Sequence, residues 1–361
     1  MKRDRSLQGA RSGDVPKGLS EMHRRQFLCS SVAAGTVAAV PACLWAGPGS
    51  SARAQGMKTL KATHGTGLCN LGIFLVKERN LAAADGVQLE FVQTPSNADI
   101  TTVFGAGLVD VSLIPYTNFL TLRDKGVPVT IISGGGAQGC ILCGQAHIKT
   151  QADAKGKSLG TFQADTLEML PYDWLKKANM SFSDVDVRYF GTSPELAQAF
   201  IAGSVDLMCH SEPYATQAVG AARPGAHVIS DGTDIYHPGY TDCVLAARTP
   251  LIKENRRELK ALIKALFVAQ KQSEDDRAAA VRDTVGKYYK ASFDVVLDAS
   301  GKQPNVVDQR GQSDFMINGG TSMIELGYII KAPDKSIFDW TMLDEVIAEN
   351  QELYKSVKIK S

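Results

Sequence analysis

After residue 54, the sequence contains no apolar run that reaches the roughly 20 residues of a membrane-spanning helix. It also contains no basic tract. The first 54 residues hold eight of the 39 Lys and Arg residues and three of the 38 Asp and Glu residues, so the rest carries a formal charge near −4. We therefore expect this part to form a soluble, mildly acidic body that binds no nucleic acid.

Patterns typical of catalysis are missing as well. The sequence has no Gly-x-Ser-x-Gly elbow for a serine nucleophile, and its six histidines form no His-x-x-x-His pair for zinc. No glycine-rich loop matches a phosphate-cradling or dinucleotide-binding pattern. We therefore predict that the protein is not an enzyme and uses no cofactor or metal.

Five cysteines follow residue 54: Cys69, Cys140, Cys143, Cys209 and Cys243. In an oxidising compartment an odd number leaves at least one thiol free. Cys140 and Cys143 have the spacing of a redox or metal motif, but they lie in an apolar, strand-like run that would point them to opposite faces. We interpret them as small buried side chains. Whether Cys140, Cys143 or Cys243 joins a disulfide stays open.

Residues 1–56 have the features of an export signal. Arg24-Arg25 stand within His-Arg-Arg-Gln-Phe-Leu, which resembles a twin-arginine motif, and a modestly apolar stretch and Ala52-Arg53-Ala54 follow. We expect cleavage after this small-x-small pattern and a periplasmic protein. A basic leader of mitochondrial type and a lipid anchor at Cys43 are the alternatives, and Met22 is an alternative start to Met1.

One short pattern occurs twice. Phe-x-Ala-Gly-x-Val-Asp begins at Phe104 and again at Phe200, 96 positions later, and each copy is followed shortly by Pro-Tyr. The glycine suits a left-handed helix end, the apolar residues after it suit a short strand, and proline suits the start of the next helix. The repeat predicts two similar α/β lobes.

The expected fold is α/β, with mainly parallel sheets in the two lobes and two crossing hinge strands between them, near 140–144 and 243–248. The predicted domains are a signal segment at 1–56, a first lobe at 57–143 and 247–361 that includes the C-terminal helices, and a second lobe at 144–246. Because ligands bind at the carboxyl ends of strands in open α/β sheets, the two lobes should form a cleft.

Five motifs, in order, carry a resemblance to a known family: Gly86-Val87, Ala106–Asp110, Lys155–Gly160, Ala202–Asp206 and Glu212–Ala215. From about Thr59 to Gln270 the chain resembles the periplasmic solute-binding proteins of nitrate/sulfonate/taurine-type ABC importers. The resemblance implies a type II periplasmic binding fold with the ligand between the lobes. It also implies a monomer that delivers a small-molecule ligand to a permease and ATPase complex at the inner membrane.

Polar residues in the loops and helix starts after the predicted strands are the candidate ligand-binding residues. They are Thr66, Asn70, Ser96, Asn97, Tyr116 and Thr117 in the first lobe, and Gln163, Asp165, Thr166, Thr192, Ser193, His210, Glu212 and Tyr214 in the second. None is an arginine. The resemblance implies a small residue at Asp165 in many sulfonate binders, so a carboxylate there favours a ligand with an amine, amide or hydroxyl donor. Asp165 is equally interpretable as a simple helix cap.

The sequence therefore predicts a periplasmic subunit that captures a small polar organic solute, such as a sulfonate, an amino-sulfonate or a nitrate-like ion, by hinge closure. The alternatives are a binding protein for a pyrimidine, a thiamine precursor or an aromatic acid, and a periplasmic ligand sensor that feeds a receptor. A thiamine-precursor synthase shares the implied fold, but this chain lacks its cysteine-rich motif.

Overall fold

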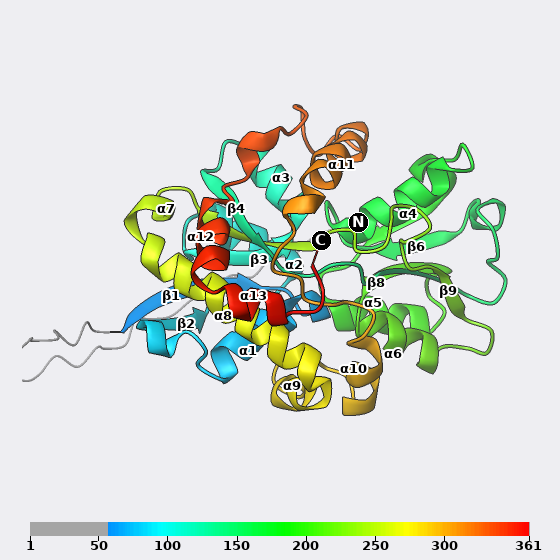
Figure 1. Ribbon diagram of the computed structural model, residues 1–361. Coiled ribbons are helices and arrows are strands. Elements are labelled where there is room, and N and C mark those ends of the chain that lie inside the picture. Colours follow the sequence, from blue (N-terminus) through cyan, green and yellow to red (C-terminus); the bar gives the residue numbers. More distant parts are fainter. Residues whose placement is uncertain (1–56, 361) are drawn as a thin grey trace, which may run out of the picture. The chain divides into compact units, whose positions relative to one another are not determined.

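The computed structural model describes residues 57–360 (Figure 1). The predictions for the signal segment, with Arg24-Arg25 and its cleavage pattern, lie outside the described residues. Within 57–360, no helix is both long enough and apolar enough to cross a bilayer.

The described chain forms two five-stranded sheets, each with parallel and antiparallel pairs. The first sheet has the order β2-β1-β3-β10-β4, and the second has the order β7-β6-β8-β5-β9. The strands of the first sheet are β1 (Lys58–His64), β2 (Val87–Phe91), β3 (Val111–Pro115), β4 (Val129–Gly134) and β10 (Cys243–Arg248). Those of the second are β5 (Cys140–Gly144), β6 (Ser158–Thr161), β7 (Asp186–Tyr189), β8 (Leu207–Ser211) and β9 (His227–Ser230).

Helices follow most strands, as expected for α/β lobes. They are α1 (Leu71–Glu78), α2 (Asn97–Gly105), α3 (Tyr116–Asp124), α4 (Thr166–Lys176), α5 (Ser193–Ile201), α6 (Tyr214–Ala221), α7 (Leu251–Glu254), α8 (Arg256–Asp275), α9 (Arg277–Thr284), α10 (Phe293–Ala299), α11 (Ser313–Glu325), α12 (Thr341–Glu349) and α13 (Gln351–Ser356). Short 3-10 helices lie at Leu68–Asn70, Ala83–Asp85, Ala152–Ala154, Phe182–Asp184, Arg310–Gln312 and Lys335–Ile337.

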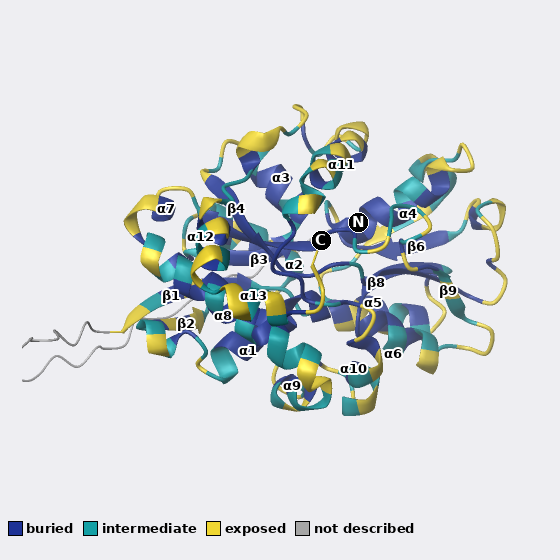
Figure 2. Ribbon diagram, in the orientation of Figure 1, coloured by how far each residue is buried: buried dark blue, intermediate teal, exposed yellow. Residues whose placement is uncertain are grey.

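Each sheet has its own core, and the strands are among the most buried elements (Figure 2). In β3, Leu113 faces the core under α1, α8 and α12, whereas its neighbour Ile114 faces the core under α2, α3 and α11. This alternation is the two-residue period of a strand covered on both faces. The second sheet is packed between α4 on one side and α5 and α6 on the other.

Both copies of the repeated pattern fold as the local chemistry predicts. Helix α2 ends at Gly105 and α5 at Ile201, and two residues later Gly107 and Gly203 take the left-handed φ values of +72° and +74°. Strands β3 and β8 follow these glycines, and Pro115 and Pro213 are the N-caps of α3 and α6. The predicted two-lobe α/β fold is confirmed, with mixed rather than mainly parallel sheets.

The chain crosses from one sheet to the other at positions that come earlier in the sequence than predicted. Strand β5, expected to be a crossing strand, pairs on both sides within the second sheet, and β10 pairs on both sides within the first. The crossings therefore lie at 135–139 and 231–242, and the expected boundaries after Cys143 and Ala246 fall inside strands. An apolar run predicts a strand but does not say which neighbours it pairs with, which is why the boundaries are displaced.

Candidate functional site

Loops at the strand ends of the two sheets meet and bond to each other directly. Thr66, which follows β1, donates a hydrogen bond from its Oγ1 to the Oγ of Ser193 at 2.9 Å, and Ser193 begins α5. The backbone N–H of Leu68 donates to the carbonyl of Glu212 at 2.7 Å. The lobes are thus in contact across the cleft, in a closed arrangement.

Three cavities lie in this region of the cleft. A central cavity of about 40 Å³ lies between two larger ones of about 290 and 410 Å³, and Asn97 lines all three. Asn97 begins α2, and its N–H also donates across the cleft to the carbonyl of Gly191 at 3.2 Å. The capping box of Ser96 and Asp99 holds this helix start in place.

The structure brings nine of the candidate residues to these cavities. The central cavity is lined by Thr66, Asn70, Asn97, Asp165 and Ser193. The cavity of about 290 Å³ adds Ser96, Thr192 and Tyr214, and that of about 410 Å³ adds Gln163. Each comes from a strand-end loop or helix start, so the positions follow from topology. Their contact with a ligand stays a prediction.

The other five candidates line none of the three cavities. Tyr116 packs edge-on against Phe315, and Thr117 is buried within α3. Glu212 accepts hydrogen bonds from the N–H and hydroxyl of Thr216, so it stabilises its own loop. The remaining two, Thr166 and His210, form hydrogen bonds within the protein.

Of these two, His210 bonds through Nε2 to the carbonyl of Ser193 at 2.9 Å, and its ring stacks on Tyr214. Burial lowers the pKa of His210 to about 4, so the ring is neutral. Thr166 donates to the carboxylates of Asp165 and Asp242, at 3.1 and 2.5 Å. Both residues therefore support groups that line the cavities.

Asp165 is both a helix cap and a cavity residue. Its side chain accepts from the N–H of Leu167 at 3.1 Å, as the N-cap of α4, and it is 6% exposed. Burial, and then the nearby charge of Asp242, raise the pKa of Asp165 to about 7. A carboxyl with this pKa readily gives up its proton to a basic group of a ligand.

Asp242 is the acid that the sequence analysis missed. It precedes β10, lies within a segment that reads as strand, and carries no local signal of a site. Its carboxylate also accepts from Gln303 Nε2 at 2.7 Å, and burial raises its pKa. Of the described residues that line the central cavity, none is a lysine or arginine, so its charge is acidic.

Two thiols also line the central cavity. They belong to Cys69, in the 3-10 helix before α1, and to Cys243, the first residue of β10. Their sulfur atoms lie 3.0 Å apart, with the Cys243 thiol donating to the sulfur of Cys69. The five cysteines in 57–360 all carry free thiols. Neither Cys69 nor Cys243 was predicted from the sequence to lie in the binding site.

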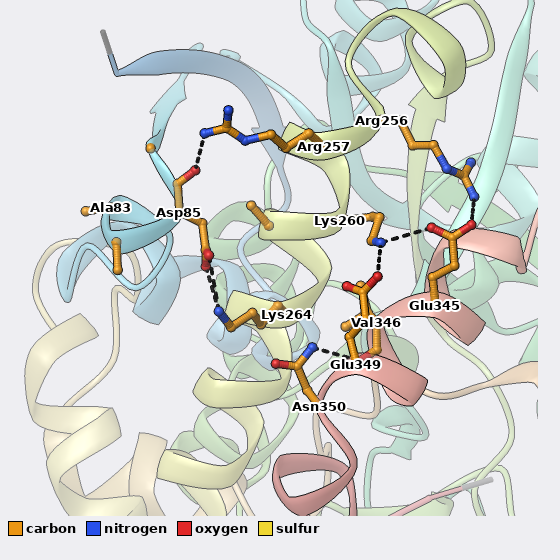
Figure 3. A pocket seen from close by; sticks show the side chains of 13 residues that line it. Ala83, Asp85, Arg256, Arg257, Lys260, Lys264, Glu345, Val346, Glu349 and Asn350 are labelled. Atoms are coloured by element: carbon orange, nitrogen blue, oxygen red, sulfur yellow. Dashed lines mark hydrogen bonds and ion pairs between the residues drawn. The ribbon is translucent and has the colours of Figure 1, made fainter. Parts of the chain in front are cut away.

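Another cavity, of about 780 Å³, lies on the first lobe, away from the carboxyl ends of the strands (Figure 3). Its basic side chains point at acids from neighbouring elements. Arg256 and Lys260 of α8 pair with Glu345 of α12, and Lys264 pairs with Asp85 at 3.0 Å. These pairs hold α8 against its neighbours, and we do not assign a ligand site there.

Two α/β lobes whose strand-end loops close over a polar cavity define a cleft-type binding protein. The sequence profile of the family described as NMT1/THI5 like matches residues 70–272, which is more than half of the chain. The protein belongs to the NMT1/THI5-like family.

Two relatives align with the chain. A putative aliphatic sulfonates-binding protein of Escherichia coli K12 is 26% identical over 218 residues, which is 59% of this chain and 66% of the relative. A 4-amino-5-hydroxymethyl-2-methylpyrimidine phosphate synthase of Schizosaccharomyces pombe is 26% identical over 140 residues, which is 38% of this chain and 40% of the relative. The chain thus spans less than two thirds of the length of either.

Solved structures show the same fold. The periplasmic nitrate-binding protein NrtA of Synechocystis PCC 6803 matches with a TM-score of 0.70 and 14% identity, over 85% of this chain and 92% of NrtA. The periplasmic aliphatic sulphonate-binding protein SsuA of Escherichia coli matches with a TM-score of 0.65 and 18% identity, over 78% and 92%. With the family match, these findings confirm the resemblance to periplasmic binding proteins of the nitrate/sulfonate/taurine type.

Proposed function

We propose that this protein is the periplasmic solute-binding subunit of an ABC importer and captures a small polar organic solute by closure of its two lobes. The observation that carries the proposal is the hydrogen bond between Thr66 and Ser193, since it joins the strand-end loops of the two sheets over polar cavities. The family membership and the shared fold support the same role. Binding rather than catalysis follows, because such a cleft needs only to close on its solute.

The solute is one that brings a hydrogen-bond donor or a positive charge to the centre of the cleft. Two buried carboxyls, Asp165 and Asp242, lie at the central cavity, whereas Lys125 and Lys290 line the outer cavities. A bare anion such as nitrate would meet these acids without a compensating cation. An amino-sulfonate or an aminopyrimidine would present an amine to Asp165 and direct its remaining polar groups to the helix starts.

A matched pair of solutes tests this proposal. Taurine and ethanesulfonate share the sulfonate and the two-carbon chain and differ by the amine. We expect taurine to stabilise the protein against thermal unfolding, by about 2.7 kcal/mol at a concentration of one hundred times its dissociation constant. Ethanesulfonate should stabilise it less.

The outcomes separate the role from the solute class. If 4-amino-5-hydroxymethyl-2-methylpyrimidine binds and taurine does not, the solute is a pyrimidine, and the binding role stands. Stabilisation by nitrate or ethanesulfonate equal to that by taurine would overturn the assignment of a donor-bearing solute. If no sulfonate, nitrate, amino-sulfonate, pyrimidine or aromatic carboxylate binds, the binding role itself is contradicted.

The proposal includes delivery and partners. The protein reaches the periplasm through the twin-arginine pathway, loses residues up to about Ala54, and acts there as a monomer. The loaded form docks on a permease and ATPase complex in the inner membrane, to which it delivers the solute.

A further inference from the structure

We propose that Cys69, Cys243 and Asp242 form a binding site for a thiophilic divalent cation of the zinc class, built into the wall of the cleft. The site goes beyond the capture of an organic solute, and it stands whether or not that solute is bound. No spacing along the sequence points to it, because Cys69 lies 174 positions before Cys243.

The ligand atoms already lie close to a tetrahedral arrangement. The two sulfurs and a carboxylate oxygen of Asp242 lie within 4.8 Å of one another. With Zn–S bonds of about 2.3 Å, tetrahedral geometry places two sulfurs about 3.8 Å apart, against 3.0 Å here. It places a sulfur and an oxygen about 3.5 Å apart, against 3.3 Å from Cys243 Sγ to Asp242 Oδ2. The sulfur–sulfur distance is thus about 0.8 Å, and this sulfur–oxygen distance about 0.2 Å, from the tetrahedral values.

The first crossing segment holds both cysteines in position. Gly136 exchanges backbone hydrogen bonds with Cys243, at 3.0 and 3.2 Å. A side chain at Gly136 would place its Cβ 2.2 Å from the Cβ of Cys69, so only glycine lets the two cysteine-bearing segments approach this closely. The pairing is thus a consequence of the fold rather than of flexible side chains.

Neighbouring side chains hydrogen-bond to the metal ligands and orient them, as in established metal sites. Gln303 Nε2 and Thr166 Oγ1 donate to the two oxygens of Asp242, at 2.7 and 2.5 Å. Asn70, which also lines the central cavity, donates from Nδ2 to the sulfur of Cys69 at 3.2 Å, and its buried Oδ1 has no hydrogen-bond partner. Three protein ligands and a cavity of about 40 Å³ leave a fourth coordination position for Asn70 Oδ1, water or a solute atom.

The ligand chemistry selects the metal class. Thiolates favour zinc and other soft cations over Mg²⁺ and Ca²⁺, which take oxygen ligands.

The test is a metal titration of the full chain with Cys29 and Cys43 changed to serine, because these two cysteines lie outside the described residues. Thiols are kept reduced with a phosphine, and Zn²⁺ is titrated in competition with a chromophoric chelator. We expect one equivalent to bind. Cys69→Ser and Cys243→Ser should each weaken binding by more than about 100-fold, because loss of a residue that only hydrogen-bonds to a metal ligand already costs about 10- to 100-fold.

Matched variants and a spectroscopic signature keep the result independent of folding defects. Cys143→Ser is the control, since Cys143 is a buried thiol that bonds to the carbonyl of Ile141 and lines no part of the site. It should bind as the parent does. Gln303→Ala should weaken Zn²⁺ binding by about 10- to 100-fold. With Cd²⁺, the parent should show an ultraviolet thiolate-to-metal band of two sulfurs, and Cys69→Ser a band of one.

Absence of Zn²⁺ binding by the reduced parent, or binding that survives both Cys69→Ser and Cys243→Ser, would overturn the site. A Cd²⁺ complex without a thiolate band would do the same. A protein that binds taurine but no Zn²⁺ would contradict the metal site and leave the importer role intact.

Discussion

Thr66 and Ser193 are 127 positions apart in the chain, yet their hydroxyl oxygens lie 2.9 Å apart and share a hydrogen bond. One residue follows a strand of the first sheet, and the other begins a helix beside the second. This contact therefore joins the two lobes across the cleft. The contact couples solute affinity to closure of the lobes, because a solute that binds in the cleft must fit the closed arrangement.

Removal of this contact should favour opening. A neutral hydrogen bond contributes about 0.5–1.5 kcal/mol, so Ser193→Ala should lower solute affinity about 2- to 13-fold. Small-angle scattering should show a larger mean radius of gyration for the free variant. Ser204→Ala, at an exposed serine of the second lobe, is the control. If Ser193→Ala matches the parent in both measurements, the contact does not hold the lobes together.

The charge at the centre of the cleft should control which solutes bind. If Asp165 meets an amine, Asp165→Asn removes a charged hydrogen bond of about 1.5–3 kcal/mol and should weaken taurine binding about 10- to 150-fold. Ethanesulfonate should bind the variant at least as well as the parent. Calorimetric titration measures both, with Asp186→Asn at an exposed position as control. Equal losses for both solutes would indicate that Asp165 acts only as a helix cap.

The same residue should give stability a distinctive pH dependence. The pKa of Asp165 rises from 3.8 to about 7 on folding, so the folded state holds its proton more tightly than the unfolded state. This group therefore destabilises the fold increasingly as pH rises from about 4 to 7, by about 4 kcal/mol for a pKa difference of about three. Asp165→Asn should gain stability relative to the parent over that range. Chemical denaturation at several pH values measures the gain, and a constant difference would contradict it.

His210 has the opposite effect over nearly the same range. Its pKa falls from 6.5 to about 4 on folding, so its contribution is present above pH 6.5 and is lost as pH falls toward 4. The difference corresponds to about 3 kcal/mol. In the parent, the two slopes therefore offset each other. His210→Gln should leave a protein whose stability falls more steeply with rising pH than that of the parent, in the same denaturation series.

Asn97 tests the placement of the site, because it lines all three cavities. Loss of one hydrogen-bond partner in a closed cleft costs about 1–3 kcal/mol, so Asn97→Ala should weaken solute binding about 5- to 150-fold. Gln88→Ala, an exposed amide on β2, should have no effect. If Asn97, Asp165, Thr192 and Ser193 can all become alanine without a change in the dissociation constant, the solute binds elsewhere.

Export should depend on the twin arginines. Replacement of Arg24 and Arg25 by lysine should leave the precursor in the cytoplasm, whereas the parent should appear in the periplasm with a mass that begins near Gln55. Fractionation followed by mass spectrometry measures both. A periplasmic protein that still begins at Met1 or Met22 would contradict the cleavage prediction.

Local chemistry was predictable from the sequence wherever the interacting groups lie within a few residues of each other. The left-handed glycines Gly107 and Gly203 formed where expected. Asp165 was left open between a cap and a ligand residue, and the structure shows that it is a cap that also lines the central cavity. Such features depend on backbone geometry, which the residue types themselves restrict.

By itself the sequence determined that there are two α/β lobes, because periodicity and helix punctuation repeat in both halves of the chain. Only the tertiary structure decided what the cleft contains. Asp242 and Cys243 lie at the start of a strand that no local pattern assigns to the first sheet, and Cys69 reaches them through contacts 173 and 174 positions away. The approach depends on Gly136 and on antiparallel pairing of β10 between β3 and β4, and strand pairing is a property of the whole fold rather than of any segment.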